Sequence, residues 1–360
     1  MRYEMITAEE LGSTERDQWN ALQESNPAIW NPFFSLGWTE LVARERNDVR
    51  ILVAEEAGKI VGFFPVQRLS AITAMPVGAP LADYCGFIAA PSQHFELCAV
   101  AEALKVDRLD FSHAPKDQTS FAKFGRIADA SWVADLSGGS QAYSARRKAG
   151  GGGEMLKKIQ QRRRKLAREY DGVSFDSFSP CPAAYEAMVG WKRRQLAETN
   201  QPDLFDRPWI ARAIRAGFEA NTPDFGGAMF VVRIHGKPVA CLLALRSRHA
   251  LHAWFTSYDE DYATVSPGNS AFLIAVEAGA DSGYAEIDFG PGDYQLKRAL
   301  ATDKRPIIDG FAGQSSLACL VRGAEFGLRN VAEKFLTGRL AELPGKAMRR
   351  VDYYRGLRSA

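Results

Sequence analysis

Apolar residues follow two different periods along the first part of the chain, and each period predicts a different kind of element. Helical spacing over residues 13–23 and 34–42 predicts two helices. Apolar runs over residues 50–55 and 59–67 predict two strands, because a tight Ala-Gly turn separates them. The elements expected next are an apolar stretch over 81–90, a helix that ends near residue 104 and a strand over 106–111.

The same order of periods returns in the second half. Residues 182–199 and 208–220 have helical spacing, and residues 227–234, 237–246 and 250–257 read as three strands. The segment RILVAEEAGKIVGFFPVQR of the first half matches MFVVRIHGKPVACLLALRS of the second in pattern and length. A turn over 266–269, a helix over 270–280 and a strand over 286–289 follow. A repeated unit of this size indicates a duplicated fold.

Four consecutive glycines, Gly150–Gly153, interrupt the chain between the two halves, and a helix interior would not tolerate them. Net charge changes at the same place. It is −7 over residues 1–143, +8 over 144–170, −4 over 171–311 and +5 over 312–360. We therefore expect two mildly acidic domains, a basic connecting helix and a basic helical extension, with these four ranges as their bounds. A connecting helix with a solvated charged face is the simplest explanation of the basic run.

Composition limits the class of protein. With 360 residues, 46% apolar and 24% charged, the chain has the make-up of about two globular domains. Five scattered cysteines without CxxC spacing predict neither a disulfide framework nor a zinc site, and the five histidines are not at metal spacing. No signal peptide and no membrane-spanning run are visible. We expect a cytoplasmic protein without a bound metal.

Two segments carry candidate chemistry. The turn Ser266-Pro267-Gly268-Asn269 precedes a helix, and a helix N-terminus binds anions, although the same residues also serve as an ordinary cap. Farther on, Asp288 ends a strand, and a Gly-rich loop with Asp293 and Lys297 follows. A carboxylate and a lysine in one loop form either a salt bridge or a clamp on a substrate.

Taken as an ordered set, several short motifs resemble the bacterial acetyltransferase-like family associated with cellulose and exopolysaccharide biosynthesis. This family belongs to the GNAT superfamily and is related to the Fem aminoacyltransferases. The motifs are Pro32-Phe33-Phe34 with Trp38, the segment 61–65, Pro76-Val77-Gly78 with Asp83-Tyr84, the basic run 157–168, Tyr258-Asp259 with Ser266-Pro267-Gly268, and Asp288-Phe289-Gly290 with Asp293 and Lys297.

The resemblance implies an α/β fold of two tandem GNAT-like domains, each a mixed, mostly antiparallel sheet flanked by helices. It implies an N-acyltransferase that moves an acetyl or other acyl group from acyl-CoA to an amine of a sugar or polysaccharide precursor. The donor pyrophosphate would lie at Val265, Ser266, Gly268, Asn269 and Ser270. This segment has a single glycine and no basic residue, which departs from the usual signature of the superfamily.

The resemblance also implies roles for individual residues. Lys297 would lie near the reacting carbonyl, Asp288 or Asp293 would act as base, and Tyr258 would protonate the leaving thiolate. The residues expected to contact the acceptor are Asp83, Tyr84, Trp254, Asp293 and Tyr294. The alternatives are packing for Trp254, a strand-end cap for Asp288, a core position for Tyr258, and turn positions for Asp83 and Tyr84.

Two other functions stay open at this stage. A Fem-like enzyme would take aminoacyl-tRNA as donor, with the basic run 144–170 as its RNA contact, although that run is short for the helical insert of Fem enzymes. A binding module would use the basic tail, with Arg349, Arg350, Tyr353 and Tyr354, to hold an anionic partner: RNA, a nucleotide signal or the inner membrane surface.

Overall fold

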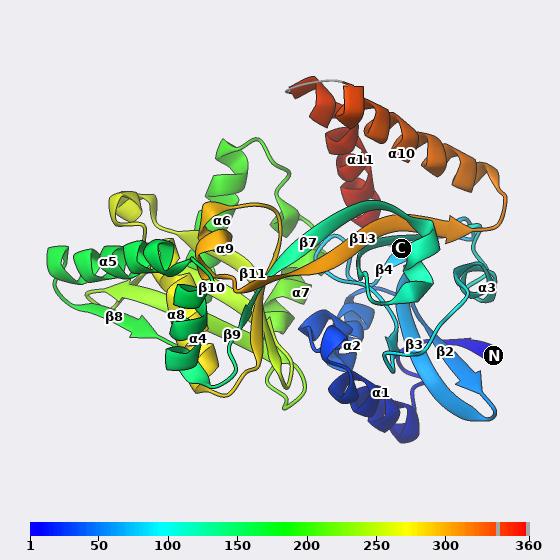
Figure 1. Ribbon diagram of the computed structural model, residues 1–360, viewed down its shortest axis with the longest axis horizontal. Coiled ribbons are helices and arrows are strands. Elements are labelled where there is room, and N and C mark those ends of the chain that lie inside the picture. The colour runs from blue at the N-terminus through cyan, green and yellow to red at the C-terminus, as the bar shows by residue number, and fades with distance from the viewer. Residues whose placement is uncertain (336–338, 358–360) are drawn as a thin grey trace. The chain divides into compact units, whose positions relative to one another are not determined.

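The protein is described by a computed structural model that covers residues 1–335 and 339–357 (Figure 1). It divides into two compact units. Unit 1 comprises Met1–Ile29, Trp38–Asp129 and Pro306–Ala360, and unit 2 comprises Trp30–Gly37 and Ala130–Arg305. These bounds differ from the division that net charge suggested. The basic run 144–170 lies inside unit 2, and the C-terminal extension is part of unit 1.

Unit 1 is an α/β layer structure built on one sheet. Its elements are β1 (Arg2–Ile6), α1 (Ser13–Ser25), α2 (Leu36–Glu45, from Trp38), β2 (Val49–Glu56), β3 (Lys59–Arg68), β4 (Thr73–Pro76), β5 (Ile88–Ala89), α3 (Leu97–Ala103) and β6 (Arg108–Pro115), with α10 (Leu317–Phe335) and α11 (Arg339–Leu357) at its end. The strand order is β1-β2-β3-β4-β6-β13, where β13 is Asp303–Gly313. Only β4 and β6 pair in parallel within this set.

Unit 2 repeats this plan with longer elements. They are β7 (Gly125–Asp135, from Ala130), α4 (Gly139–Ala149), α5 (Gly153–Glu169), β8 (Val173–Asp176), α6 (Pro182–Glu198), α7 (Pro208–Glu219), β9 (Gly226–Ile234), β10 (Lys237–Arg246), β11 (Ala250–Tyr258), α8 (Pro267–Asp281), β12 (Glu286–Pro291) and α9 (Gln295–Leu300). The strand order is β7-β12-β11-β10-β9-β8, with β11 and β12 parallel and the other pairs antiparallel.

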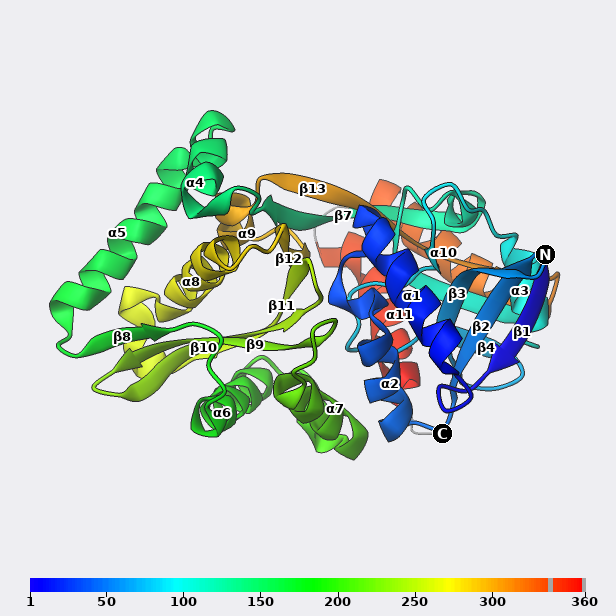
Figure 2. The same ribbon diagram turned by 90° about the horizontal axis from the view of Figure 1, so that it is seen from below.

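Both faces of the unit 2 sheet are covered. Helix α8 packs on one face of β9–β11, and α6 and α7 pack on the other (Figure 2). Because both faces are buried, β10 is an almost continuous apolar run rather than an alternating one. The main core of the unit includes Leu251 and Ile287 from the sheet and Leu273 from α8.

The duplicated hairpins share one turn geometry. Ala57-Gly58 between β2 and β3, and His235-Gly236 between β9 and β10, have φ values of 49° and 75° at their two central residues. Positive φ at both positions matches the right-handed twist of the flanking strands. The repeat in the sequence is therefore a repeat in backbone conformation.

Two strands pass from one unit to the other along the chain. β7 begins at Gly125 in unit 1 and pairs with β12 of unit 2 through Ser131–Asp135. β13 begins at Asp303 in unit 2 and pairs with β6 of unit 1 through Ile307–Gly313. Each sheet thus ends with a strand that comes in part from the opposite half of the sequence.

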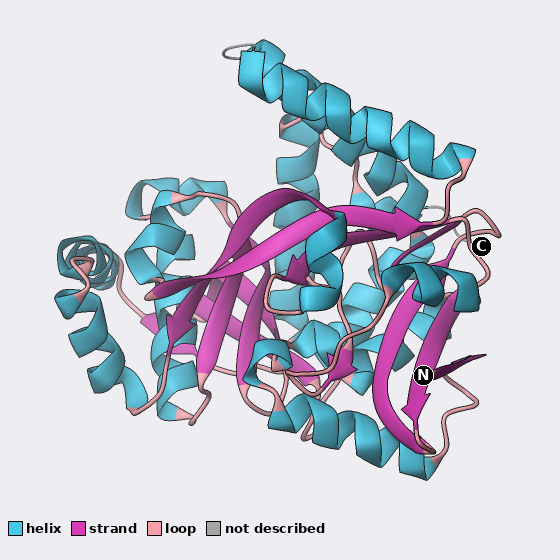
Figure 3. Cartoon of the chain, turned by 45° about the vertical axis from the view of Figure 1, so that its right-hand side comes forward, coloured by secondary structure: helices cyan, strands magenta, loops and turns pink. Residues whose placement is uncertain are grey.

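Helices α10 and α11 belong to unit 1 and pack against each other (Figure 3). Arg322 of α10 joins them: it is 5% exposed and lies 2.7 Å from Asp352 of α11 and 3.2 Å from Asp110 of β6. Phe326 and Met348 complete a small core against β13. Arg322, Arg329 and Arg355 of the basic tail are thus in ion pairs. The anionic partner expected for the tail stays a prediction.

The sequence pattern predicted most of these elements, and the expected α/β class, with two units that each have a mostly antiparallel sheet flanked by helices, is confirmed. Gly150, Gly151 and Gly152 lie between α4 and α5, and Gly153 is the first residue of α5, so no glycine of this run lies in a helix interior. The strands β1, β7, β8 and β13 and the helices α4 and α9 were not anticipated. The helix expected over 317–340 is described as far as Phe335, and residues 336–338 lie outside the described residues.

Candidate active site

Strands β11 and β12 separate after three residues, and this split is the main feature of unit 2. They pair only through Ala250–His252 and Glu286–Asp288. Beyond that point β11 stays paired with β10 as far as Tyr258, and β12 stays paired with β7 as far as Pro291. The sheet therefore opens between two neighbouring parallel strands.

Helix α8 begins beside this split. A short 3₁₀ helix (Glu260–Val265) leads from β11 to Ser266, whose φ of 51° is left-handed, and Pro267 occupies the first helical position. Ser270 is 1% exposed, and its Oγ has no hydrogen-bond partner among the described residues. An unpartnered buried hydroxyl costs free energy, and a hydrogen bond to a ligand would recover that cost. The five residues predicted to bind the donor, Val265 to Ser270, are brought together here.

Tyr258 lies at the outer end of β11, next to the start of α8. A Cβ added at Gly268 would lie 3.4 Å from Cδ1 of Tyr258, so the ring passes along the first turn of the helix. The side chain of Tyr258 is 40% exposed, which excludes the core position considered as its alternative.

Trp254 faces the opposite side of the sheet. A bulge in β11 separates the pairs Leu243–Phe255 and Ala244–Ala253, and leaves Trp254 without an opposite residue on β10. Its ring lies close to Gly217 of α7 and 6.4 Å from the ring of Phe33. The packing alternative therefore accounts for its position at least in part.

Asp288 and His252 are opposite one another at the closed end of the split. They form the last β11–β12 pair, both are fully buried, and His252 Nδ1 lies 3.7 Å from Asp288 Oδ1. Asp288 Oδ1 accepts hydrogen bonds from Ser131 Oγ at 2.5 Å and from the N–H of Gly290 at 2.7 Å. This carboxylate therefore holds the β12 bulge in shape, a role close to the strand-end cap considered for it.

The segment Trp30–Gly37 covers this pair. Asn31 Oδ1 accepts from the N–H of Phe33, so Asn31 Nδ2 faces His252 Nδ1 at 2.9 Å. On the other side of Asp288, Arg305 Nη1 lies 3.7 Å from Oδ2, and Arg305 Nη2 bonds Glu286 at 2.7 Å. Burial raises the pKa of Glu286, and Arg305 partly offsets this effect.

Lys297 belongs to α9, and its side chain reaches back to the end of β12. Its Nζ donates to the carbonyl oxygens of Gly290 at 3.1 Å and Pro291 at 2.6 Å, and lies 5.4 Å from the ring centre of Tyr294. Tyr294 is 66% exposed. The exposed Asp293 pairs with Arg298 rather than with Lys297, and the Arg298 guanidinium lowers the pKa of the Asp293 carboxyl. Gly290 thus links the two side chains, because its N–H donates to Asp288 and its carbonyl oxygen accepts from Lys297.

The remaining predicted residues, Asp83 and Tyr84, belong to unit 1. They lie in the loop between β4 and β5, and Tyr84 is 2% exposed. His252, Asn31, Ser131 and Arg305 were not predicted as site residues. His252 was considered only as a metal ligand, and no cluster of His, Cys, Asp or Glu suited to a metal is found in the described part of the chain. What joins the four residues is their position around the paired Asp288 and His252, which depends on the strand register.

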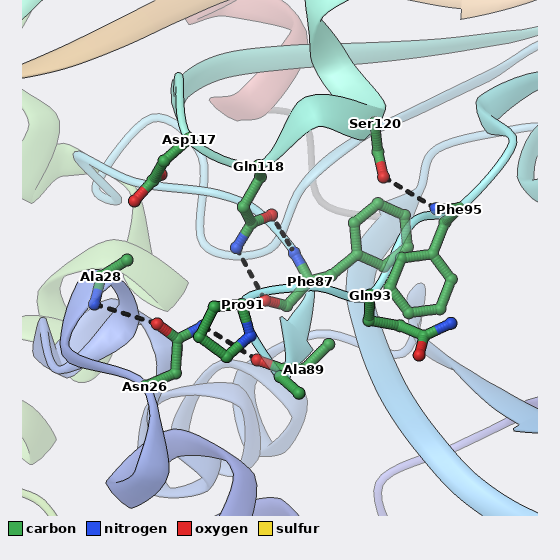
Figure 4. A pocket seen from close by; sticks show the side chains of 11 residues that line it. Asn26, Ala28, Phe87, Ala89, Pro91, Gln93, Phe95, Asp117, Gln118 and Ser120 are labelled. Carbon is green, nitrogen blue, oxygen red and sulfur yellow. Dashed lines mark hydrogen bonds between the residues drawn. The ribbon is translucent and has the colours of Figure 1, made fainter.

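Unit 1 has a counterpart of the split, and a side chain bridges backbone beside it; Figure 4 shows Gln118 bonded to Phe87 at the edge of a small pocket. β4 and β6 pair in parallel only at Thr73–Ala74, and β5 then continues the line of β4 along β3. Gln118, just after β6, binds both the N–H and the C=O of Phe87 at 2.9 Å. Phe87 stacks on Phe95 with ring centres 4.1 Å apart. A cavity of about 50 Å³ remains, lined in part by Asn26, Pro91, Gln93 and Asp117.

Part of unit 2 matches a known protein family in sequence. Residues 153–298 match the family model for the acetyltransferase (GNAT) domain. Unit 2 therefore carries an acyltransferase domain. No curated protein matches the chain. No helix among the described residues is long and apolar enough to cross a membrane.

Solved structures support the fold over most of the chain. The crystal structure of FemX is 10% identical, with a TM-score of 0.53 over 86% of this chain and 96% of that one. The C-terminal domain of a putative lysylphosphatidylglycerol synthetase from Agrobacterium fabrum is 13% identical, with a TM-score of 0.50 over 85% and 95%. A tandem GNAT protein from the clavulanic acid biosynthesis pathway is 12% identical over 86% and 98%, with a TM-score of 0.47.

Proposed function

We propose that unit 2 transfers an acyl group from a thioester donor, acyl-CoA, to a primary amine. The split between β11 and β12, with α8 beginning beside it, is the observation that carries this proposal. An extended chain with amide groups binds well along an open strand edge, and a phosphate binds well at a helix N-terminus. The pantetheine arm and the pyrophosphate of CoA have these two chemistries in this order.

The donor phosphates would be held mainly by the backbone. Residues 263–272 include no Lys or Arg, so the helix dipole of α8 and its first N–H groups supply the positive potential. Ser270 Oγ adds one hydroxyl donor directed to a buried position. This arrangement fits a linear anionic donor without requiring a cation in the loop.

The reaction itself requires few groups. A neutral amine attacks the thioester carbonyl, the tetrahedral oxyanion collapses, and the C–S bond breaks. The nitrogen of the new amide releases one proton to water, and the thiolate of CoA takes up one proton. Tyr258, exposed beside the split, would give the thiolate its proton, and the ammonium of Lys297 would stabilise negative charge on the carbonyl oxygen. We assign Asp288 as a positioning residue, because its bond to Gly290 fixes the carbonyl that Lys297 contacts.

The acceptor is proposed to be an amino group on a sugar or a polysaccharide precursor. Two exposed aromatic rings, Tyr258 and Tyr294, support this, because sugars stack on such rings. The exposed carboxylate of Asp293 would attract the ammonium form of the amine. Trp254, Asp83 and Tyr84 stay proposals as acceptor contacts.

The donor assignment is tested with a charge at Gly268. An added Cβ there has only ordinary contacts, so Gly268→Glu keeps the fold, and an acidic residue in the first turn stabilises a helix. We expect the carboxylate to repel the donor phosphates and to raise the Kd of acetyl-CoA about tenfold or more in calorimetry. The control Gly268→Gln has the same size without the charge. Equal Kd values for the two variants would contradict the donor site.

The acceptor is tested separately, by product formation with a panel of amines at saturating acetyl-CoA. Turnover with glucosamine-type sugars, but not with amino acids or polyamines of the same charge, is the expected result. Preference for a non-sugar amine would reject the sugar while leaving the donor site intact.

A second donor, aminoacyl-tRNA, is favoured by one observation. The exposed face of α5 carries six cations, and α5 contacts the 3₁₀ helix that precedes α8. They are Lys157, Lys158, Arg162, Arg164, Lys165 and Arg168. Such a face binds a phosphate backbone in a salt-dependent manner. Charge reversal at Lys158 and Arg162 weakens binding of charged tRNA if RNA is the donor, and leaves the Kd of acetyl-CoA unchanged if CoA is.

A further inference from the structure

Exposed apolar side chains concentrate on one helix of unit 1. Helix α10 carries six large ones, and their exposed fractions range from 48% for Val321 to 77% for Leu317. The others are Leu320, Leu328, Val331 and Phe335. An exposed apolar surface of this extent marks an interaction site. The opposite side of α10, with Arg322 and Phe326, is buried against α11 and the sheet.

The spacing of the exposed residues identifies the kind of surface. Leu317, Val321, Ala324, Leu328, Val331 and Phe335 follow one another at intervals of four, three, four, three and four residues. This is the 3.5-residue period of a helix–helix seam, and no position in it is charged. The helix has 19 residues, so the stripe runs along about 28 Å.

We infer that this stripe pairs with the same stripe of a second copy of the chain, in antiparallel orientation. The intervals read the same in both directions, so a two-fold axis level with residue 326 brings each position opposite another position of the stripe. Leu317 then meets Phe335 of the other copy, and Val321 meets Val331. Ala324 meets Leu328, so the smallest residue faces a large one at the centre.

The charges beside the stripe favour a second copy over a lipid surface. A helix that lies on an anionic membrane carries Lys and Arg along the border of its apolar face. Here the positions that flank the stripe are Leu320, Gly327 and Lys334 on one side and Ala318, Glu325 and Ala332 on the other. Glu325 is itself paired with Arg322. The border thus carries one lysine and one glutamate and is close to neutral, which suits another helix better than an anionic lipid surface.

Light scattering on the full chain tests the pairing. We expect a mass of twice 39.7 kDa for the unchanged protein. The double variant Val321→Glu with Leu328→Glu should be a monomer with an unchanged circular dichroism spectrum. The matched control Leu343→Glu places a charge on an exposed apolar residue of α11 and should stay dimeric. A monomeric unchanged protein, or a dimer that survives the double variant, overturns the inference.

Cross-linking tests the orientation without disrupting the seam. The single variants Val321→Cys and Val331→Cys are purified separately, mixed and oxidised. If the pair is antiparallel, the mixture forms a cross-linked dimer. Each variant alone then cross-links no more than the unchanged protein, whose own cysteines set the background. Cross-linking of each variant alone overturns the orientation. Co-sedimentation of a monomeric protein with phosphatidylglycerol vesicles, lost in the double glutamate variant, would assign the stripe to lipid instead.

Discussion

The two halves of the molecule share one strand plan but treat the gap between their parallel strands differently. In unit 2 no backbone ladder joins β11 and β12 beyond His252 and Asp288. In unit 1 the side chain of Gln118 takes the place of the missing ladder, and phenylalanine rings occupy the space behind it. Topology alone therefore does not make a donor site; the residues at the gap decide.

The helices that follow β11 in unit 2 and β5 in unit 1 also differ in length and in the residues at their N-termini. α8 has 15 residues and begins after the left-handed Ser266, whereas α3 has seven and begins after Glu96, whose carboxylate would repel a phosphate. Counted from the helix start, Ser270 of α8 corresponds to Val100 of α3. Unit 1 thus has an acid and an apolar residue where unit 2 has hydroxyls.

Removal of Lys297 is expected to have the largest effect. Loss of one electrostatic contact to a developing oxyanion costs about 100-fold in kcat. We predict this loss for Lys297→Ala, measured by product formation at saturating acyl-CoA, with little change in donor Kd. Lys116 follows β6 as Lys297 follows β12, so Lys116→Ala is the matched control and should keep full activity. Equal losses for both variants would contradict the functional difference between the units.

Gln118→Ala tests whether the two hydrogen bonds between Gln118 and Phe87 stabilise unit 1 at its gap. The variant leaves the buried N–H and C=O of Phe87 without their partner, at a cost of about 2 kcal/mol. Urea unfolding should detect this loss, while the donor Kd of unit 2 stays the same. Gln93 lines the same cavity, and Gln93→Ala should change the unfolding free energy little. A Gln118→Ala protein as stable as the unchanged one would show that the amide does not bridge the gap.

Ser270→Ala has the smallest expected effect and separates binding from stability. If Oγ bonds a donor phosphate or its neighbouring amide, its loss raises the Kd of acyl-CoA about tenfold. Because Oγ lacks a partner in the protein, stability should stay constant or rise. Ser282, at the other end of α8, provides the control Ser282→Ala. Unchanged affinity would remove Ser270 from the donor site.

The sequence was informative where the signal is local. The period of the apolar residues located the hairpins of both halves, and the Ser266–Asn269 turn correctly marked the start of α8. β7 and β13 could not be recognised, because what defines them is a partner more than a hundred residues away. For the same reason the neighbours of Asp288 were not predicted: only the strand register brings Ser131 and His252 beside it.

The crossing of β7 and β13 has a consequence for synthesis. β6 is complete at Pro115, but β13, its neighbour on the side away from β4, does not begin to pair with it until Ile307. At a translation rate of about 5–20 residues per second, this strand waits about 10 to 40 s for its partner. During that time its edge is open to pairing with other chains. The amino-terminal half therefore cannot finish folding on the ribosome before nearly all of the second half has been made.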